Sequence, residues 1–117
     1  MAAATRRLET ADGTVVADSC AVANSFWPRL RGLLGRSELA AGEGLCLQDC
    51  SSIHMFFMRF PIDVAFVNAE GRVLHACHAI RPWRMSRHVF GAKAALELPA
   101  GTLQRLGIGR DSVLKLV

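Results

Sequence analysis

Long apolar runs are the first feature that this sequence lacks. The chain starts with Met1 and three alanines, and two arginines follow within the first seven residues. A secretory signal needs roughly 7–15 apolar residues behind its basic part, and a membrane-spanning helix needs roughly 18. Neither kind of segment is found between Met1 and Val117. The sequence therefore predicts a cytoplasmic protein with no membrane partner.

Internal repeats, linkers rich in proline or serine, and blocks of like charge are also missing. The 117 residues are 51% hydrophobic and 21% charged, which is typical of a globular protein. A chain of this length buries enough surface to fold without disulfide bonds. We expect one globular domain over residues 13–117, preceded by a flexible segment over residues 1–12.

The four cysteines form no Cys-x-x-Cys pair, and they are expected to be free thiols in or near the core. Cys50 is close to His54 in sequence, but a nucleophile and its base are recognised by contact in space, so a packed thiol is the expected state. The four possible ligands of a zinc ion are Cys46, Cys50, His75 and Cys77. They do not include two cysteines separated by only two residues, which is the spacing typical of structural zinc sites. A glycine-rich phosphate loop is absent as well. We expect no metal and no cofactor.

Hydrophobic periodicity predicts six or seven short strands and two short helices. The strands are expected at residues 14–22, 45–47, 53–60, 62–67, 73–80, 92–98 and 113–117. One helix should begin at Ser25 and stop at Gly35, and a second should cover Thr102–Leu106. Asn68–Gly71 has the composition of a hairpin turn. The predicted fold class is α+β, mainly β: a small, mostly antiparallel sheet curled toward a barrel.

The run SSIHMFFMRFPIDV at residues 51–64 resembles the signature of an uncharacterised prokaryotic family, the domains of unknown function number 192. Further stretches resemble the same family in the same order: 29–35, 42–45, 71–73, 82–83, 96–101 and 107–108. The resemblance implies a compact, mainly β domain with no assigned reaction. Cys46 and Cys77 stand where the family usually has apolar residues, and Asp49 stands where proline is common. The resemblance therefore implies no shared cysteine chemistry.

Polar residues interrupt three of the apolar segments. His54 lies in one predicted strand with Arg59, Asp63 lies in the next strand, and Glu97 is flanked by two leucines near the end of another. A buried carboxylate or imidazole needs hydrogen-bond partners, so these residues can belong to one network. A structural network, a ligand-binding cleft and acid–base catalysis by His54 with Asp63 all fit this pattern.

Lysine is scarce, since twelve of the fourteen cationic side chains are arginine. Three arginines recur around Trp83 in an irregular stretch, at Arg81, Arg84 and Arg87, with His88 next to the last. Guanidinium groups bind carboxylates and phosphates, and an indole ring can stack on a base or a cation. A solvated loop anchored by Trp83, a site for an anionic ligand or acidic protein, and a nucleic-acid surface all remain open.

We predict a small non-enzymatic binding domain as the leading hypothesis. Its polar, partly basic cleft would take an anionic small molecule or an acidic protein surface. The residues of this predicted site are His54, Arg59, Asp63, Arg81, Trp83 and Glu97. The first alternative is a hydrolase-like enzyme in which His54 is the base and Asp63 orients it. The second alternative is nucleic-acid binding through the arginines, which the scarcity of lysine and the absence of a recognised motif disfavour.

Overall fold

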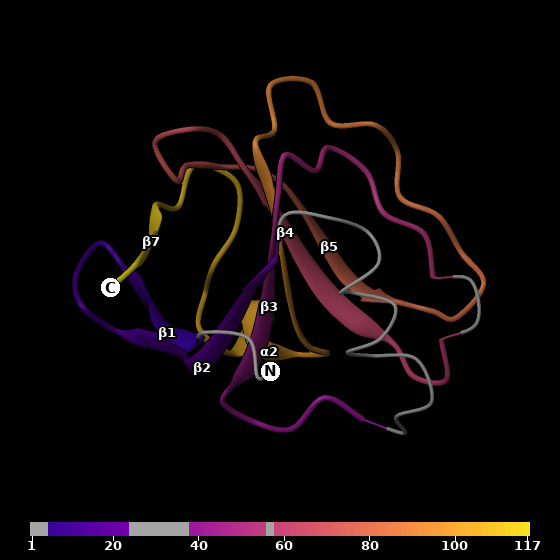
Figure 1. Cartoon of the computed structure of the whole chain (residues 1–117), viewed down its shortest axis with the longest axis horizontal. Coiled ribbons are helices and arrows are strands. Elements are labelled where there is room, and N and C mark those ends of the chain that lie inside the picture. Colours follow the sequence, from indigo (N-terminus) through magenta and orange to yellow (C-terminus); the bar gives the residue numbers. More distant parts are fainter. Residues whose placement is uncertain (1–4, 24–37, 56–57) are drawn as a thin grey trace.

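Seven strands form one mixed sheet in the computed structural model of the protein (Figure 1). The structure describes residues 5–23, 38–55 and 58–117. The strands are β1 (Thr5–Thr10), β2 (Val15–Ala23), β3 (Glu43–Gln48), β4 (Ile62–Val67), β5 (Val73–Ile80), β6 (Ala94–Pro99) and β7 (Leu114–Leu116). They are arranged in the order β5-β4-β6-β3-β2-β1-β7, so β5 and β7 are the edges. In the described residues one helix, α2 (Thr102–Arg105), accompanies the sheet.

Neighbouring strands run antiparallel, except for the pair of β2 and β3. These two strands are parallel, with Cys20 opposite Gly44 and Val22 opposite Cys46. A parallel pair needs a crossover connection between its strands. The helix predicted from Ser25 to Gly35 falls in that connection, at residues outside the described part of the chain.

Most of the predicted elements are confirmed. β4 and β5 have the predicted bounds, and four other strands and α2 lie within a few residues of theirs. Within the segment 1–12 that was predicted to be flexible, Thr5–Thr10 form β1, which pairs with both β2 and β7. No helix among the described residues is long and apolar enough to cross a membrane.

The predicted curl toward a barrel is wrong, because the sheet stays open. Next to its edge strands β5 and β7, the described residues form an isolated bridge between Arg72 and Val113 and a few backbone hydrogen bonds, but no ladder joins the two strands. β7 has three residues, all of which pair with β1, so it is too short to form a ladder along the eight residues of β5. The fold is therefore a mainly β, open mixed sheet.

Residues 53–60 were expected to form a strand, and the described part of this segment does not. His54 makes only an isolated bridge, with Met85. The reason is that β4 already has a hydrogen-bonded neighbour on each side, β5 and β6, which leaves no place for another strand there. The segment is nevertheless buried through Ile53, Met55 and Phe60, because it covers one face of the sheet.

All six residues of β4 are buried, so both faces of the sheet carry a core. One face packs on α2 in what we call the helix layer: Leu8, Val16, Ala17, Cys20, Cys46, Ala65, Val67, Val73, Leu96, Leu98, Leu103, Ile108 and Leu114. The other face packs under irregular segments in what we call the loop layer: Leu39, Leu45, Leu47, Ile53, Met55, Met58, Phe60, Ile62, Val64, Phe66, Val89 and Ala95. Each large side chain buried in this way contributes roughly 1.5–3 kcal/mol of transfer free energy.

Residues 81–90, which we call the basic aromatic loop, form part of the cover over the loop layer. Backbone hydrogen bonds fasten the loop to the segment 51–55: Met55 N to Arg84 O (2.7 Å), Trp83 N to Met55 O (2.7 Å), Ser86 N to Ile53 O (2.9 Å) and Val89 N to Ser51 O (2.8 Å). The segment 51–55 and the basic aromatic loop thus provide hydrogen-bond partners for each other's backbone N–H and C=O groups. Both run along the same side of the molecule (Figure 1).

Asp63 is the polar residue of β4, and it ties three elements together. Its Oδ1 accepts a hydrogen bond from Ala79 N at 2.8 Å, and its Oδ2 accepts one from Leu103 N at 3.0 Å. Ala79 has a positive φ of 49° and lies in β5 where the register with β4 shifts. Leu103 lies in the first turn of α2. The carboxylate therefore holds both a bulge and a helix end against β4.

At Gly71 the turn between β4 and β5 comes close to the backbone of β7. Its φ is +82°, which confirms the predicted turn, and its carbonyl accepts a hydrogen bond from Leu114 N at 2.8 Å. A Cβ at this position would lie 2.1 Å from the carbonyl oxygen of Leu114. Only glycine fits, for both conformational and steric reasons.

We expect Gly71→Ala to destabilise the protein more than Gly13→Ala does. Gly13 also has a positive φ, of 89°, but a Cβ there meets nothing within 4 Å. Gly13→Ala should therefore cost only the conformational strain, about 1–2 kcal/mol, and Gly71→Ala should cost at least about 1 kcal/mol more because of the clash. Urea denaturation of both variants measures the difference. Equal losses would show that the approach of Gly71 to β7 is not tight.

We expect Asp63→Ala to lower the free energy of unfolding by roughly 2–4 kcal/mol, because it leaves the buried N–H of Leu103 and the part-buried N–H of Ala79 without an acceptor. Glu70→Ala is the matched control, since Glu70 is an exposed carboxylate. It should change the unfolding free energy by less than about 0.5 kcal/mol. Guanidinium chloride denaturation gives both values. Similar behaviour of the two variants would rule out the structural role of Asp63.

Candidate functional site

The two buried carboxylates of the predicted site lie on opposite faces of the sheet. β4 and β6 pair in regular register, with Asp63 opposite Leu98 and Val64 opposite Glu97. Asp63 therefore faces the helix layer and Glu97 faces the loop layer, because neighbouring strand positions alternate between faces. Both are 0% exposed. The sheet separates them, so they do not line one cleft.

His54 and Asp63 are not brought together either. The neighbours of His54, Ile53 and Met55, pack in the loop layer, whereas Asp63 uses its two oxygens to bind backbone N–H groups on the other face. Arg59 is exposed in the bend that precedes β4. The hydrolase-like arrangement, with His54 as base and Asp63 as its orienting partner, is therefore not assembled in the structure.

Two residues of the predicted site, Arg81 and Trp83, do lie together, in the basic aromatic loop. Trp83 has a φ of +69°, which is rare for a bulky side chain and costs of order 1–3 kcal/mol. Its N–H donates to Met55 O, and Arg84 N donates to Arg81 O at 3.2 Å, so a hydrogen-bonded turn holds this conformation. The indole projects outward and is 58% exposed. Trp83 is therefore not buried in the core, which disfavours the alternative of a solvated loop anchored by Trp83.

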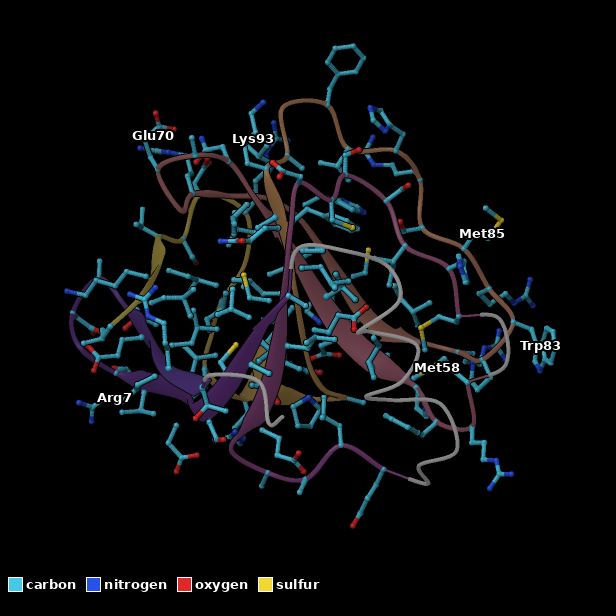
Figure 2. All side chains as sticks on the ribbon, viewed as in Figure 1. Arg7, Met58, Glu70, Trp83, Met85 and Lys93 are labelled. Carbon is cyan, nitrogen blue, oxygen red and sulfur yellow. The ribbon has the colours of Figure 1, made fainter. Side chains whose placement is uncertain are left out.

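Large exposed apolar side chains concentrate in this loop. Among the described residues, five large apolar side chains are exposed, and three of them are Trp83 (58%), Met85 (66%) and Phe90 (92%). We call these three the loop apolar side chains. Figure 2 shows Trp83 and Met85 pointing away from the body of the molecule on the same side. The backbone hydrogen bonds to residues 51–55 and the buried Val89 hold the loop that exposes them.

The charge around these side chains is positive and uncompensated. Arg81, Arg84 and Arg87, which we call the loop arginines, are all exposed. The ion pairs of the described residues are elsewhere, between Arg7 and Glu9 and between Arg72 and Asp111. No aspartate or glutamate occurs anywhere in residues 71–96.

The field of Arg87 reaches the edge strand β5. Burial is the main cause that lowers the pKa of His75, and the charges of Arg87 and Arg110 lower it further. Burial raises the pKa of Cys77, and Arg87 opposes that shift. A 3.1 Å hydrogen bond between the Nδ1 of His88 and the Oγ of Ser51 holds the His88 side chain against the segment 51–55. The basic surface thus extends from the loop toward β5.

The cysteines are free thiols, as predicted, and they do not form a metal centre. Burial, and to a lesser degree Cys46, raises the pKa of Cys20 to about 12. Burial is also the main cause that raises the pKa of Cys46. Thiols of this kind are poor nucleophiles and poor metal ligands. No group of three or more His, Cys, Asp or Glu side chains in the described part of the chain could hold a metal ion.

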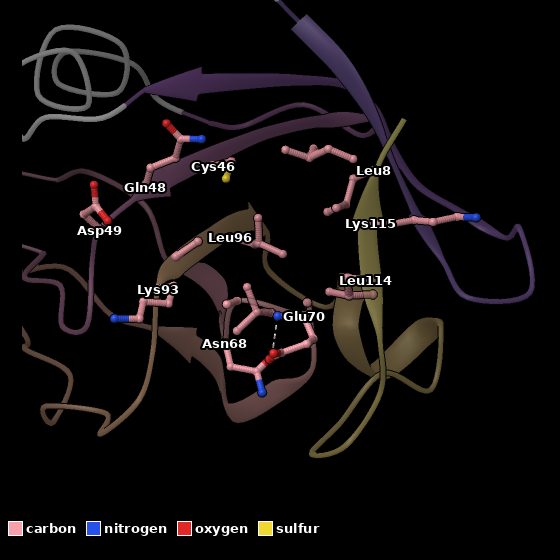
Figure 3. A pocket seen from close by; sticks show the side chains of 15 residues that line it. Leu8, Cys46, Gln48, Asp49, Asn68, Glu70, Lys93, Leu96, Leu114 and Lys115 are labelled. Atoms are coloured by element: carbon pink, nitrogen blue, oxygen red, sulfur yellow. Dashed lines mark hydrogen bonds between the residues drawn. The ribbon is translucent and has the colours of Figure 1, made fainter.

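A pocket of about 510 Å³ lies elsewhere, and sequence reasoning missed it (Figure 3). Its apolar floor belongs to the helix layer: Leu8, Cys46, Val67, Leu96 and Leu114. Its rim carries polar groups: Gln48, Asp49, Asn68, Glu70, Lys93 and Lys115. In Figure 3, Lys93 lies on the same side as Asp49, and Lys115 lies on the opposite side.

The pocket includes none of the six residues of the predicted site. Its lining comes from the strands β1, β3, β4, β6 and β7 and from the turn after β4, so no continuous motif marks it. One signal was available in the sequence: Lys93 and Lys115, the only lysines of the chain, both line the pocket. That signal becomes meaningful only when the sheet order brings the two residues to the same opening.

Comparison with solved structures places the fold among known ones. A protein of Sinorhizobium meliloti, described as a candidate transcription regulator, matches with a TM-score of 0.79 and 25% identity, over 99% of this chain and 96% of that one. A protein of unknown function from Novosphingobium aromaticivorans matches with a TM-score of 0.78 and 23% identity, over 95% of this chain and 83% of that one.

Comparison of sequences identifies the family. A UPF0127 protein of Thermococcus sibiricus is 35% identical over 89 residues, which are 73% of this chain and 57% of that relative. The chain thus spans little more than half the length of this curated relative. The model of DUF192, described as "Uncharacterized ACR", matches residues 7–116. The resemblance noted in the sequence is therefore confirmed, and the chain belongs to the DUF192 family, whose function is not known.

Proposed function

We propose that this protein is a non-enzymatic binding domain that takes an anionic partner on the basic aromatic loop. One observation carries the proposal: a single fixed loop presents three arginines, without an ion pair among the described residues, beside three exposed apolar side chains. Arginine, tryptophan and methionine are enriched in binding interfaces. The proposal keeps Arg81 and Trp83 from the predicted site, and it does not require the cleft of His54, Arg59, Asp63 and Glu97.

The strained conformation of Trp83 supports the same interpretation. Bulky residues with positive φ are costly and tend to occur at functional sites. The hydrogen bond from Trp83 N to Met55 O keeps the backbone in this state while the indole stays 58% exposed. The strained backbone thus keeps an apolar ring at the surface, where a partner can contact it.

The structure offers less support to the two alternatives. A hydrolase would need His54 and Asp63 in contact, and they belong to opposite sides of the sheet. Nucleic-acid binding is suggested by the loop arginines and by the description of the Sinorhizobium meliloti relative. The scarcity of lysine and the absence of a recognised motif disfavour it.

We predict that replacing the loop arginines with alanine weakens binding to heparin. The logarithm of the association constant falls as the logarithm of the salt concentration rises. Loss of three contacts should make this slope less steep by about 2–3, if each arginine contributes as a phosphate contact does. Affinity chromatography on heparin at several salt concentrations measures this slope. The control is a variant with the same loss of charge at three other exposed positions: Arg105→Ala, Arg110→Ala and Lys115→Ala.

The comparison of these two variants tests the proposal, because both lower the net charge equally. A local site predicts a large effect of the loop substitutions and a small effect of the control. Equal effects would mean that heparin responds only to overall charge, and the proposal would fail.

The pocket favours a second function, the binding of a small ligand. Its volume of about 510 Å³ lies within the range of ligand sites, and it combines an apolar floor with polar groups at the rim. The rim carries two lysines and two carboxylates, Asp49 and Glu70. This charge pattern suits an aliphatic zwitterion, such as a branched-chain amino acid, better than the purely anionic ligand that the sequence suggested.

We predict that leucine raises the melting temperature of the protein, by about 4–8 °C at roughly ten times its dissociation constant. Ala94→Leu should abolish the shift, because Ala94 lines the pocket and a larger side chain would fill it. Ala100→Leu, at an exposed position outside the pocket, should keep the shift. Differential scanning fluorimetry measures all three proteins. A shift that survives in Ala94→Leu would place the ligand elsewhere.

A further inference from the structure

We infer that the partner of the basic aromatic loop is the surface of an anionic lipid bilayer, which departs from the prediction of no membrane partner made from the lack of long apolar runs. The inference rests on the proposed function, since it names the partner of the same loop. It starts from the loop apolar side chains, which a purely ionic partner would leave in water. A partner that uses the whole loop must offer negative charge and an apolar environment together.

The exposed apolar side chains are spread along the loop. They occupy positions 83, 85 and 90, and arginines stand at positions 81, 84 and 87. Trp83 and Met85 project from the outline of the molecule (Figure 2). A protruding loop of this kind fits a surface into which separate side chains can sink.

The interface of a bilayer supplies both kinds of contact. Aromatic rings are favoured at the level of the headgroups, where their apolar bodies leave water. Arginines next to them meet lipid phosphates, and each cationic side chain near an anionic leaflet contributes about 1 kcal/mol. The absence of acidic residues from residues 71–96 means that no nearby carboxylate of that stretch repels the headgroups. Duplex nucleic acid would satisfy the arginines and leave Met85 and Phe90 in water.

The backbone of the loop is suited to shallow contact. Four hydrogen bonds to residues 51–55 and the burial of Val89 hold it on the body of the protein. The side chains can therefore enter the interface with little loss of backbone entropy. The contact is peripheral: exposed side chains of the loop enter the headgroup region, and the sheet stays outside.

Co-sedimentation with vesicles tests the inference. The probes are vesicles of phosphatidylcholine alone and of phosphatidylcholine mixed with phosphatidylglycerol. We expect wild-type protein to sediment with the mixed vesicles and only weakly with the neutral ones. Substitution of the three loop arginines by alanine should lower the partition coefficient on mixed vesicles by roughly 100-fold, from about 1 kcal/mol per arginine.

A second variant separates lipid binding from simple anion binding. Trp83→Asn, Met85→Ser and Phe90→Ser together remove the loop apolar side chains and keep every arginine; asparagine tolerates the positive φ of position 83. This variant should lose vesicle binding roughly 10-fold or more and retain its affinity for heparin. The control, Val15→Ser with Val117→Ser, removes exposed apolar side chains elsewhere (43% and 54% exposed) and should bind vesicles normally.

The outcomes are distinguishable. If heparin binding depends on the loop arginines but mixed vesicles do not bind, the lipid inference fails and the proposed function stands. If heparin binding does not depend on them, the proposed function fails. Glycerol phosphate that competes fully with the vesicles would indicate a small-anion site and overturn the inference. Binding of single-stranded DNA that needs the loop apolar side chains, without vesicle binding, would assign the loop to nucleic acid instead.

Discussion

The burial of β4 on both faces is the constraint on which the rest of the structure depends. All six of its residues are buried, so each face of the sheet needs a cover. α2 and the strands near it cover one face. Two irregular segments cover the other, and their backbone groups find partners in each other, as in the bonds of Met55 with Trp83 and Arg84. The pairing that closes the core therefore also fixes the loop that carries the arginines.

The same constraint explains why the predicted polar cleft does not exist. The sequence indicates that Asp63 and Glu97 lie in buried strands, and that is correct. Whether residues on two strands share a face of the sheet depends on the register in which the strands pair. A shift of the register by one residue moves a side chain to the opposite face. The observed register puts Val64 opposite Glu97, so Asp63 faces the other layer. Pattern alone does not contain this information.

Other parts of the fold could be predicted to differing extents. β4 and β5 were predictable because their apolar residues are bounded by Pro61 and by the turn at Gly71. β1 was not, because Leu8 is its one buried residue and its other side chains give no alternating pattern. Residues 53–60 were predicted to form a strand because they are apolar, whereas the described apolar residues of this range, such as Ile53, Met55 and Phe60, are buried because they cover the sheet. The pocket depends on five strands at once and was beyond sequence reasoning.

The side chains that the proposed binding would use are not the ones that stabilise the fold. The loop is held by backbone hydrogen bonds and by the buried Val89, whereas Met85 is 66% exposed and Phe90 is 92% exposed. Their replacement therefore removes little that holds the chain together, since surface substitutions usually change stability by less than about 0.5 kcal/mol. Apolar side chains that contribute so little to folding, beside uncompensated arginines on a fixed backbone, are best explained by contact with a partner.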